Sequence, residues 1–256
     1  MKKYFAFFIL SLFMCLSIQA QDSLFLRKEF IFKGDTLRYR VMFPENYSKN
    51  KKYPLVIFLH GSGECGNDNE KQLVHGASLF EDQKNRTNFP AIVIFPQCPV
   101  TDSWVNYKDT NPNTFEFIDG KKPTKALEMT KKLIDHYQKT EAVDKKRIYV
   151  SGLSLGGMAT YDLICRYPKT FAAAIPICGA VEVVRLKKVL KMPVRIYHGA
   201  NDDAVSVEYA RNAYNELKAN GSKNVEYIEF PGVGHNCWDN AFSQPDFLIW
   251  MFSKHK

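Results

Sequence analysis

The chain has 256 residues, of which 45% are hydrophobic and 24% charged, and its formal net charge at pH 7 is +8. This length and composition fit one large domain with a substantial core, and they exclude an intrinsically disordered chain. The positive charge is dispersed in short clusters such as residues 145–147, so it predicts solvated loops and no nucleic-acid partner.

The first twenty residues have the pattern of an export signal. Lys2 and Lys3 are followed by an uncharged apolar run over residues 4–18, and Ala20 offers a small residue for cleavage. An uncleaved anchor helix is the alternative, but the run is at the short end for spanning a bilayer. We therefore expect residues 1–20 to be a signal peptide and the mature chain, with no integral membrane span, to be secreted or periplasmic.

The cysteines beyond this segment are odd in number, so at least one thiol per monomer is unpaired. They have no paired CxxC spacing, so no metal site is predicted. They are Cys65, Cys98, Cys165, Cys178 and Cys237.

Strand-like segments open the folded part of the chain. Residues 24–32 and 37–43 are separated by the turn-forming residues 33–36, which predicts an antiparallel hairpin. Short apolar runs then alternate with helical stretches, a pattern typical of strands buried on both faces of a mostly parallel sheet. These runs cover residues 55–59, 91–95, 148–150, 171–175, 194–197 and 225–230.

Helices are expected between these strands. Residues 124–138 carry an apolar stripe, Ser206 is a plausible N-cap for a helix that stops at residues 220–221, and residues 245–252 form a last helix. The prediction is one domain over residues 21–256, of class α/β, with a mostly parallel central sheet, antiparallel N-terminal edge strands and helices on both faces.

Two connections bear on function. Residues 176–193 have room for one short helix, near residues 181–191, and not for a large cap domain. Residues 96–122 form a long, mostly non-periodic loop that contains Trp104, and such loops are usually functional or disordered.

The sequence Gly152-Leu-Ser154-Leu-Gly156 carries the strongest chemical signal. It follows a predicted strand and precedes a helix-compatible stretch, which is the context of a nucleophile elbow. Ser154 is therefore the predicted nucleophile, and the amide of Leu155 would lie at a helix N-terminus where an oxyanion is stabilised.

A serine needs a base, and the base needs a carboxylate to orient it. His235 follows the last predicted strand on a glycine-rich loop and is the predicted base. Asp202 and Asp203 follow the strand at residues 194–197, and both can reach in principle; we choose Asp202 as the acid. The order Ser, Asp, His is the one expected for this arrangement.

The second oxyanion donor is expected after the strand at residues 55–59. There the Ser62 amide is the first choice, while His60 is expected to orient its loop and His198 to stabilise its own turn.

With these residues in place, the chain resembles the α/β-hydrolase carboxylesterases of the phospholipase/carboxylesterase and prolyl-oligopeptidase-like groups, in particular an exported bacterial branch of predicted peptidases and esterases. The resemblance covers about residues 52–252. It rests on LHGSGE at residues 59–64, GNDN at 66–69, FPQCP at 95–99, GLSLGG at 152–157 and GHNCW at 234–238. It implies the α/β-hydrolase fold and ester hydrolysis without a metal or organic cofactor.

The chain departs from these relatives where they commonly carry arginine and it has Cys65. The loss of that cation removes a partner for Glu64 or for a nearby loop carboxylate. Cys65, Cys98 and Cys237 all fall on loops expected at the catalytic edge, which leaves a disulfide between two of them open.

The sequence thus predicts a serine carboxylesterase that acts on short acyl or aryl esters, or on acyl groups of carbohydrate, through an acyl-serine. Trp104 and Trp238 are candidates for contact with a sugar or phenolic group, against the alternative of ordinary packing. Two other readings stay open, a serine peptidase of prolyl-oligopeptidase-like type and a binding module without turnover.

Overall fold

A computed structural model describes residues 24–111, 113–118 and 122–256. The predicted signal peptide, residues 1–20, lies outside the described residues. Within the part that the structure describes, no helix has both the length and the apolar character that crossing a bilayer requires.

The centre of the molecule is one eight-stranded sheet in the order β1-β2-β4-β3-β7-β8-β9-β10. The strands from β4 to β10 along this order run parallel to one another, while β1 and β2 pair antiparallel at one edge. The predicted α/β class and mixed sheet are confirmed. The strands are β1 (Leu26–Phe32), β2 (Asp35–Met42), β3 (Tyr53–Leu59), β4 (Ile92–Pro96), β7 (Val143–Leu153), β8 (Ala173–Ile177), β9 (Val194–Gly199) and β10 (Val225–Phe230).

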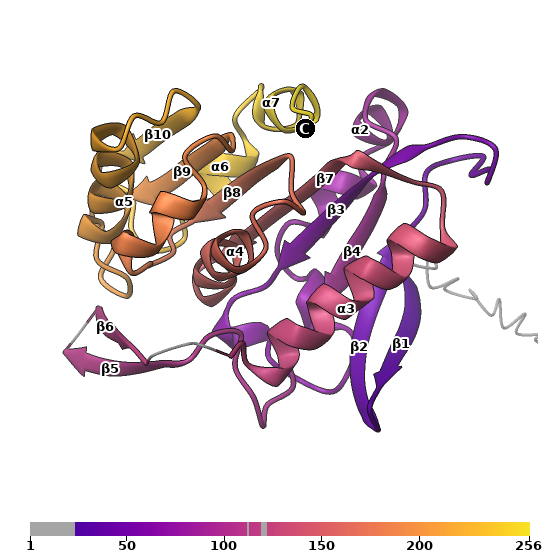
Figure 1. Ribbon diagram of the computed structural model, residues 1–256, viewed down its shortest axis with the longest axis horizontal. Coiled ribbons are helices and arrows are strands. Elements are labelled where there is room, and N and C mark those ends of the chain that lie inside the picture. Colours follow the sequence, from indigo (N-terminus) through magenta and orange to yellow (C-terminus); the bar gives the residue numbers. More distant parts are fainter. Residues whose placement is uncertain (1–23, 112, 119–121) are drawn as a thin grey trace, which may run out of the picture.

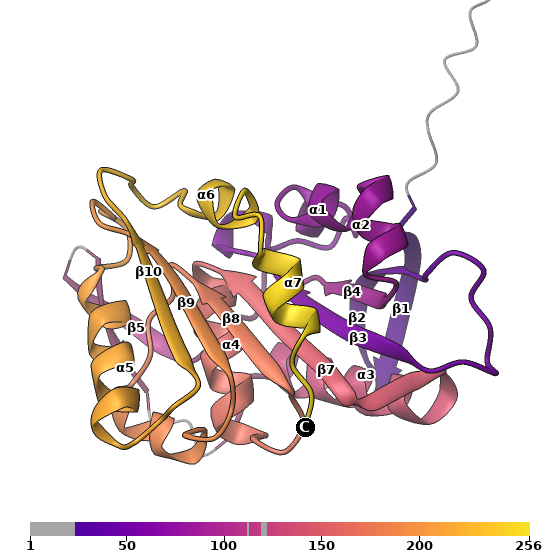
Figure 2. The same ribbon diagram turned by 90° about the horizontal axis from the view of Figure 1, so that it is seen from above.

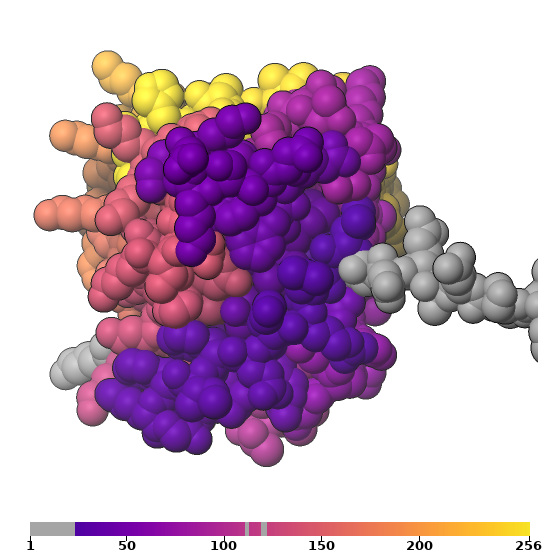
Figure 3. Space-filling model, turned by 90° about the vertical axis from the view of Figure 1, so that its right-hand side faces the viewer, coloured from indigo at the N-terminus to yellow at the C-terminus, as the bar shows by residue number. Residues whose placement is uncertain are grey.

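The edge hairpin turns through Lys33 and Gly34, both at positive φ, so that Phe32 faces Asp35. Two central residues at positive φ fit the twist of the flanking strands. Figure 3 views the molecule from this side, where the N-terminal strands (indigo) lie beside the pink surface of the helix that follows residue 124.

Helices cover both faces of the sheet, because alternate side chains of each buried strand point to opposite sides. Leu55, Ile57 and Leu59 of β3 pack in one buried cluster, and Val56 and Phe58 pack in another. The first cluster lies under α3 (Lys125–Thr140), α4 (Leu155–Arg166) and α5 (Glu208–Ala219). The second lies under α1 (Ala77–Glu81), α6 (Trp238–Phe242) and α7 (Phe247–Phe252), with α2 (Gln83–Asn88) beside α1 (Figures 1 and 2).

Two connections matter for the site, and the first departs from the predicted elements. Within the long loop a small hairpin forms from β5 (Tyr107–Asn111) and β6 (Thr114–Phe117), and the hydroxyl of Tyr209 on α5 bonds both backbone groups of Phe115. The connection between β8 and β9 holds the predicted short helix, which is a 3₁₀ helix, η3 (Val183–Lys188). In the described residues this connection holds no cap domain.

Candidate active site

The nucleophile sits on a strained turn between β7 and α4. Ser154 has φ 54° and ψ −120°, a conformation that a residue with a side chain adopts only when its surroundings hold it there. Its amide donates to the Ile177 carbonyl at 2.9 Å. It also lies 3.3 Å from the Cys178 sulfur, so the neighbouring strand β8 holds the turn in place.

Close backbone contacts explain the two flanking glycines. A methyl group on Gly156 would overlap the carbonyl oxygen of Leu59, and one on Gly152 would overlap the carbonyl of Gly156. The turn therefore packs directly onto the end of β3.

We expect Gly156→Ala to lower the free energy of unfolding by about 3 kcal/mol or more, because the clash is with backbone that cannot rotate away. Urea unfolding followed by circular dichroism measures this. Gly63→Ala is the matched control, since no atom lies within 4 Å of the added carbon. Equal unfolding midpoints for the two variants would contradict the close packing of the elbow.

The predicted base, His235, is within hydrogen-bond distance of the nucleophile. His235 follows β10, and its Nε2 is 2.8 Å from the Ser154 Oγ. Its loop passes so close to the end of β9 that a side chain at Gly199 would overlap the Gly234 carbonyl. Glycine at position 199 thus lets the histidine loop turn back over the sheet.

The structure brings Asp202, and not Asp203, to the base. The Asp202 oxygens lie 2.9 and 2.8 Å from Nδ1 of His235, and the carboxylate also accepts the amides of Ala204 and Val205. Asp203 is exposed.

A second histidine supports the acid. Nε2 of His198 lies 3.1 Å from Asp202 Oδ2 and 2.9 Å from the Val205 carbonyl, with both His198 and the Asp202 side chain fully buried. Burial alone would raise the pKa of Asp202, but hydrogen bonds from His198, His235 and the Val205 amide outweigh it and hold the pKa well below its ordinary value. The carboxylate is therefore ionised at neutral pH and fixes the His235 proton on Nδ1, which leaves Nε2 to accept from Ser154.

The two predicted oxyanion donors are the first residues of the helices that follow the adjacent strands β3 and β7. Ser62 opens the 3₁₀ helix η1 (Ser62–Glu64) after β3, and Leu155 opens α4 after β7. The first amide of a helix has no partner within that helix, so the Ser62 and Leu155 amides remain the predicted oxyanion donors.

The prediction that Trp104 contacts the substrate is corrected by its position. The ring is fully buried, its Nε1 donates to the His60 carbonyl at 3.2 Å, and it packs on the His60 ring. Trp104 supports the loop that carries Ser62 and leaves no surface for a ligand.

His60 is the centre of that support. Its Nδ1 is 2.6 Å from the Gly61 carbonyl, and the Cys98 amide donates to its Nε2 at 2.9 Å. Protonation of Nε2 would destroy the second bond, and burial, the largest cause, lowers the pKa of His60 from 6.5 to about 4.

This pKa makes stability depend on pH in a defined window. His60 binds a proton more weakly in the folded protein than in the unfolded chain. Its contribution to the free energy of unfolding is therefore complete above pH 6.5 and is lost as the pH falls toward 4. We expect the free energy of unfolding to drop by about 3 kcal/mol across this range in the wild type. Urea unfolding at several pH values should show a clearly smaller drop for His60→Gln; parallel curves would contradict the assignment. The pKa of Asp202 is lowered from a value that is already acidic. The contribution of Asp202 to the free energy of unfolding is therefore lost only below about pH 4, outside the window of His60.

Trp238, the other predicted aromatic contact, lies beside the base. Its half-buried ring meets the His235 ring edge to face, with centroids 5.6 Å apart, and it also contacts His75. It is therefore placed where a group bound at Ser154 could reach it.

Thiols gather in two pairs around the site. The Cys65 and Cys98 thiols share a hydrogen bond between the loops after β3 and β4, and the Cys178 and Cys237 thiols share another next to the triad. All five described cysteines are free thiols, so no disulfide joins Cys65, Cys98 or Cys237. Glu64, which lacks an arginine at position 65, lies 3.8 Å from His75 Nε2. Sequence reasoning gave Cys178 no role, and its positive φ of 40° has no sequence signal.

Cys178, Asp202 and His235 offer atoms within 4.8 Å of one another, but their chemistry fits a triad better than a metal site. Asp202 already accepts from several donors, and burial, together with a hydrogen bond to Cys237, raises the pKa of the Cys178 thiol, whereas a metal needs the thiolate.

Residues 46–246 match the Phospholipase/Carboxylesterase family. The chain belongs to this family. It is an α/β-hydrolase and an enzyme of the carboxylesterase type.

Similar proteins and a similar solved structure, all named as esterases, are consistent with this family assignment. The carboxylesterase SOBER1 of Arabidopsis thaliana is 25% identical over 71% of this chain and 82% of that protein. The bifunctional acetylxylan esterase/xylanase XynS20E of Neocallimastix patriciarum is 27% identical over 64% of this chain, which spans only 21% of that protein. A crystal structure of a thermostable esterase superposes with a TM-score of 0.82 at 32% identity, over 91% of this chain and 63% of that one.

Proposed function

We propose that the protein is an exported serine carboxylesterase that works through an acyl-serine at Ser154. The observation that carries the proposal is the continuous hydrogen-bonded chain from Ser154 Oγ through His235 to the buried Asp202. A peptidase would use the same three groups, but nothing in the described site favours an amide substrate.

The reaction follows from the positions of the protons. His235 Nε2 takes the proton of Ser154 while Oγ bonds the ester carbonyl carbon, and the carbonyl oxygen becomes an oxyanion facing the Ser62 and Leu155 amides. Collapse breaks the bond to the leaving oxygen, which receives the proton from His235. Water then attacks the acyl-serine by the same sequence, and the acid and free Ser154 are released.

Carbohydrate esters are the substrate class that we favour. One relative is named an acetylxylan esterase/xylanase, and a second, from Aspergillus niger, a probable feruloyl esterase C that is 25% identical over 78% of this chain and 67% of that protein. In the described residues the connection between β8 and β9 holds no cap domain that would exclude a polymer, and Trp238 offers a ring beside the base.

A panel of acetylated and feruloylated oligosaccharides, short p-nitrophenyl esters and peptides tests this proposal. We expect every ester to be cleaved in a Ser154-dependent way, the carbohydrate esters with the highest kcat/KM, and the peptides not at all. Peptide cleavage that exceeds ester cleavage would overturn it.

Export is part of the proposal and rests on residues 1–20 alone. Mass spectrometry of protein from the extracellular or periplasmic fraction of the native host should find a chain that starts at Gln21. An intact N-terminus on a membrane-bound protein would favour the anchor.

A further inference from the structure

A cavity of about 490 Å³ runs along α4, away from the nucleophile. Met158, Asp162 and Arg166 form its floor, four residues apart on one face of the helix. Ser154 is the N-cap of α4, four residues before Met158, so Met158 marks the end of the cavity nearer the nucleophile, although no triad residue lines the cavity. From Met158 to Arg166 the helix rises by about 12 Å.

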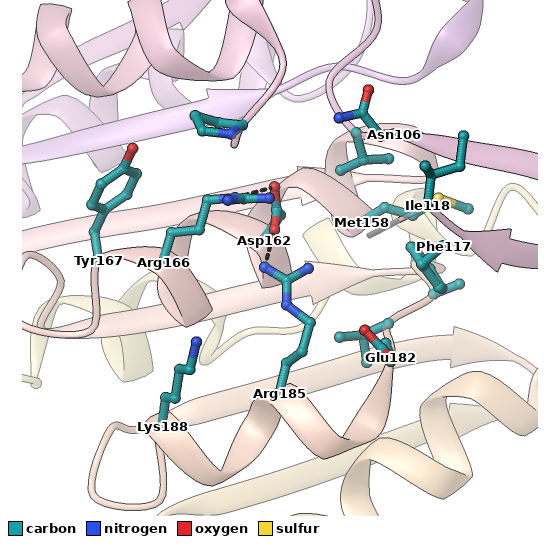
Figure 4. Close-up of a pocket in the computed structure, with 14 residues that line it drawn as sticks. Asn106, Phe117, Ile118, Met158, Asp162, Arg166, Tyr167, Glu182, Arg185 and Lys188 are labelled. Atoms are coloured by element: carbon teal, nitrogen blue, oxygen red, sulfur yellow. Dashed lines mark hydrogen bonds and ion pairs between the residues drawn. The ribbon is translucent and has the colours of Figure 1, made fainter. Parts of the chain in front are cut away.

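The cavity changes character along its length (Figure 4). Phe117 and Ile118 lie at the end near Met158, with the carboxylate of Glu182 on the same side. Arg166, Arg185, Lys188 and Tyr167 lie toward the other end. The half nearer the nucleophile is therefore mainly apolar, and the far half is mainly cationic.

Among the described lining residues, one carboxylate lies between the three cations of the far half. Asp162 accepts from Nε of Arg166 at 2.8 Å and from one terminal nitrogen of Arg185. A guanidinium has five N–H donors, so Arg185 keeps donors for a ligand in the cavity. Both guanidinium side chains are mostly shielded from water, at 12% and 21% exposure, where a charge attracts its partner more strongly than at the open surface.

We propose that this cavity is a subsite for a carboxylate on the substrate, so that the enzyme prefers esters of acidic oligosaccharides, with a uronic acid held by Arg185 and Lys188. Planar carboxylates suit the forked donors of arginine. The distance along α4 places that acid beyond the esterified sugar, while Met158 and Phe117 contact the rings between them. The inference rests on the proposed ester hydrolysis at Ser154 and names its substrate class.

The test compares two substrates on each protein, an acetylated oligosaccharide that ends in a uronic acid and the same compound with that acid reduced to the neutral sugar. We expect the wild type to show a KM about tenfold lower for the acidic compound, with similar kcat, as one charge-assisted contact would give. In Arg185→Gln and in Lys188→Gln the ratio of the two KM values should fall toward one.

Lys187→Gln is the matched control, since it removes the same charge from the same helix and Lys187 does not line the cavity. It should keep the wild-type ratio. Because each ratio is taken within one protein, a variant with less folded material is still informative, and Lys188→Gln serves if Arg185→Gln fails to fold.

The outcomes separate this inference from the proposed function. Ser154-dependent cleavage of both compounds with equal KM values would overturn the subsite and leave the esterase standing. A preference that survives both substitutions, or is lost in Lys187→Gln, would also overturn the subsite. Absence of any Ser154-dependent ester cleavage would overturn the proposed function itself.

Discussion

Replacement of Ser154 by alanine is expected to lower kcat on p-nitrophenyl acetate by about 10⁴- to 10⁶-fold, with little change in KM. Alanine keeps the Cβ and the strained backbone but removes the oxygen that His235 Nε2 contacts at 2.8 Å. The oxyanion amides remain, so a small residual rate above water is expected. Steady-state kinetics with an active-site titration of the wild type gives the number.

The companion variant His235→Ala should lose about as much, and the double variant little more, because nucleophile and base act as one unit. Additive losses, or a Ser154→Ala variant with more than a tenth of wild-type kcat, would show that another group performs the attack.

Replacement of Asp202 by asparagine is expected to reduce kcat by about 10⁴-fold while the fold is retained. The amide can donate to His235 Nδ1 and so favours the tautomer whose proton is on Nε2, where the serine proton must go. His198, which lies 3.1 Å from the Asp202 oxygen, would lose its charged partner as well. Kinetics at neutral pH, with circular dichroism to verify folding, measures the effect.

Asp203→Asn is the control for that result. The two aspartates are adjacent in the chain, but Asp203 is exposed and Asp202 holds the imidazole. We expect Asp203→Asn to keep at least half of the wild-type kcat. A larger loss from Asp203→Asn than from Asp202→Asn would reverse the assignment of the acid.

The strands and the catalytic order were predictable because both follow local rules. The buried strands β3, β4 and β8 are continuous apolar runs, and β10 was predicted at the observed bounds, residues 225–230. The GxSxG turn stands between strand and helix, and residues at the ends of parallel strands meet at one edge of the sheet.

The features that escaped prediction depend on distant partners. The hairpin of β5 and β6 was missed because its strands are short and lack a buried apolar run, and the Tyr209 hydroxyl of α5 bonds it at Phe115. Trp104 was assigned to the substrate because an aromatic in a long loop suggests binding, whereas its indole N–H finds a buried acceptor on His60, forty-four residues earlier.

The sequence predicted one of the two contacts of His198. Its place at the end of β9 indicated support for its own turn, and its ring does bond the Val205 carbonyl. Its contact with the catalytic carboxylate required the folded loop, which brings residue 202 back over the strand end.

The most direct test of the account is covalent capture of the nucleophile. A fluorophosphonate should add one equivalent to the wild type, with peptide mapping that places the adduct on Ser154, and should label His235→Ala far more slowly and Ser154→Ala not at all. An adduct at another residue, or labelling of Ser154→Ala at the wild-type rate, would contradict the proposed acyl-serine mechanism.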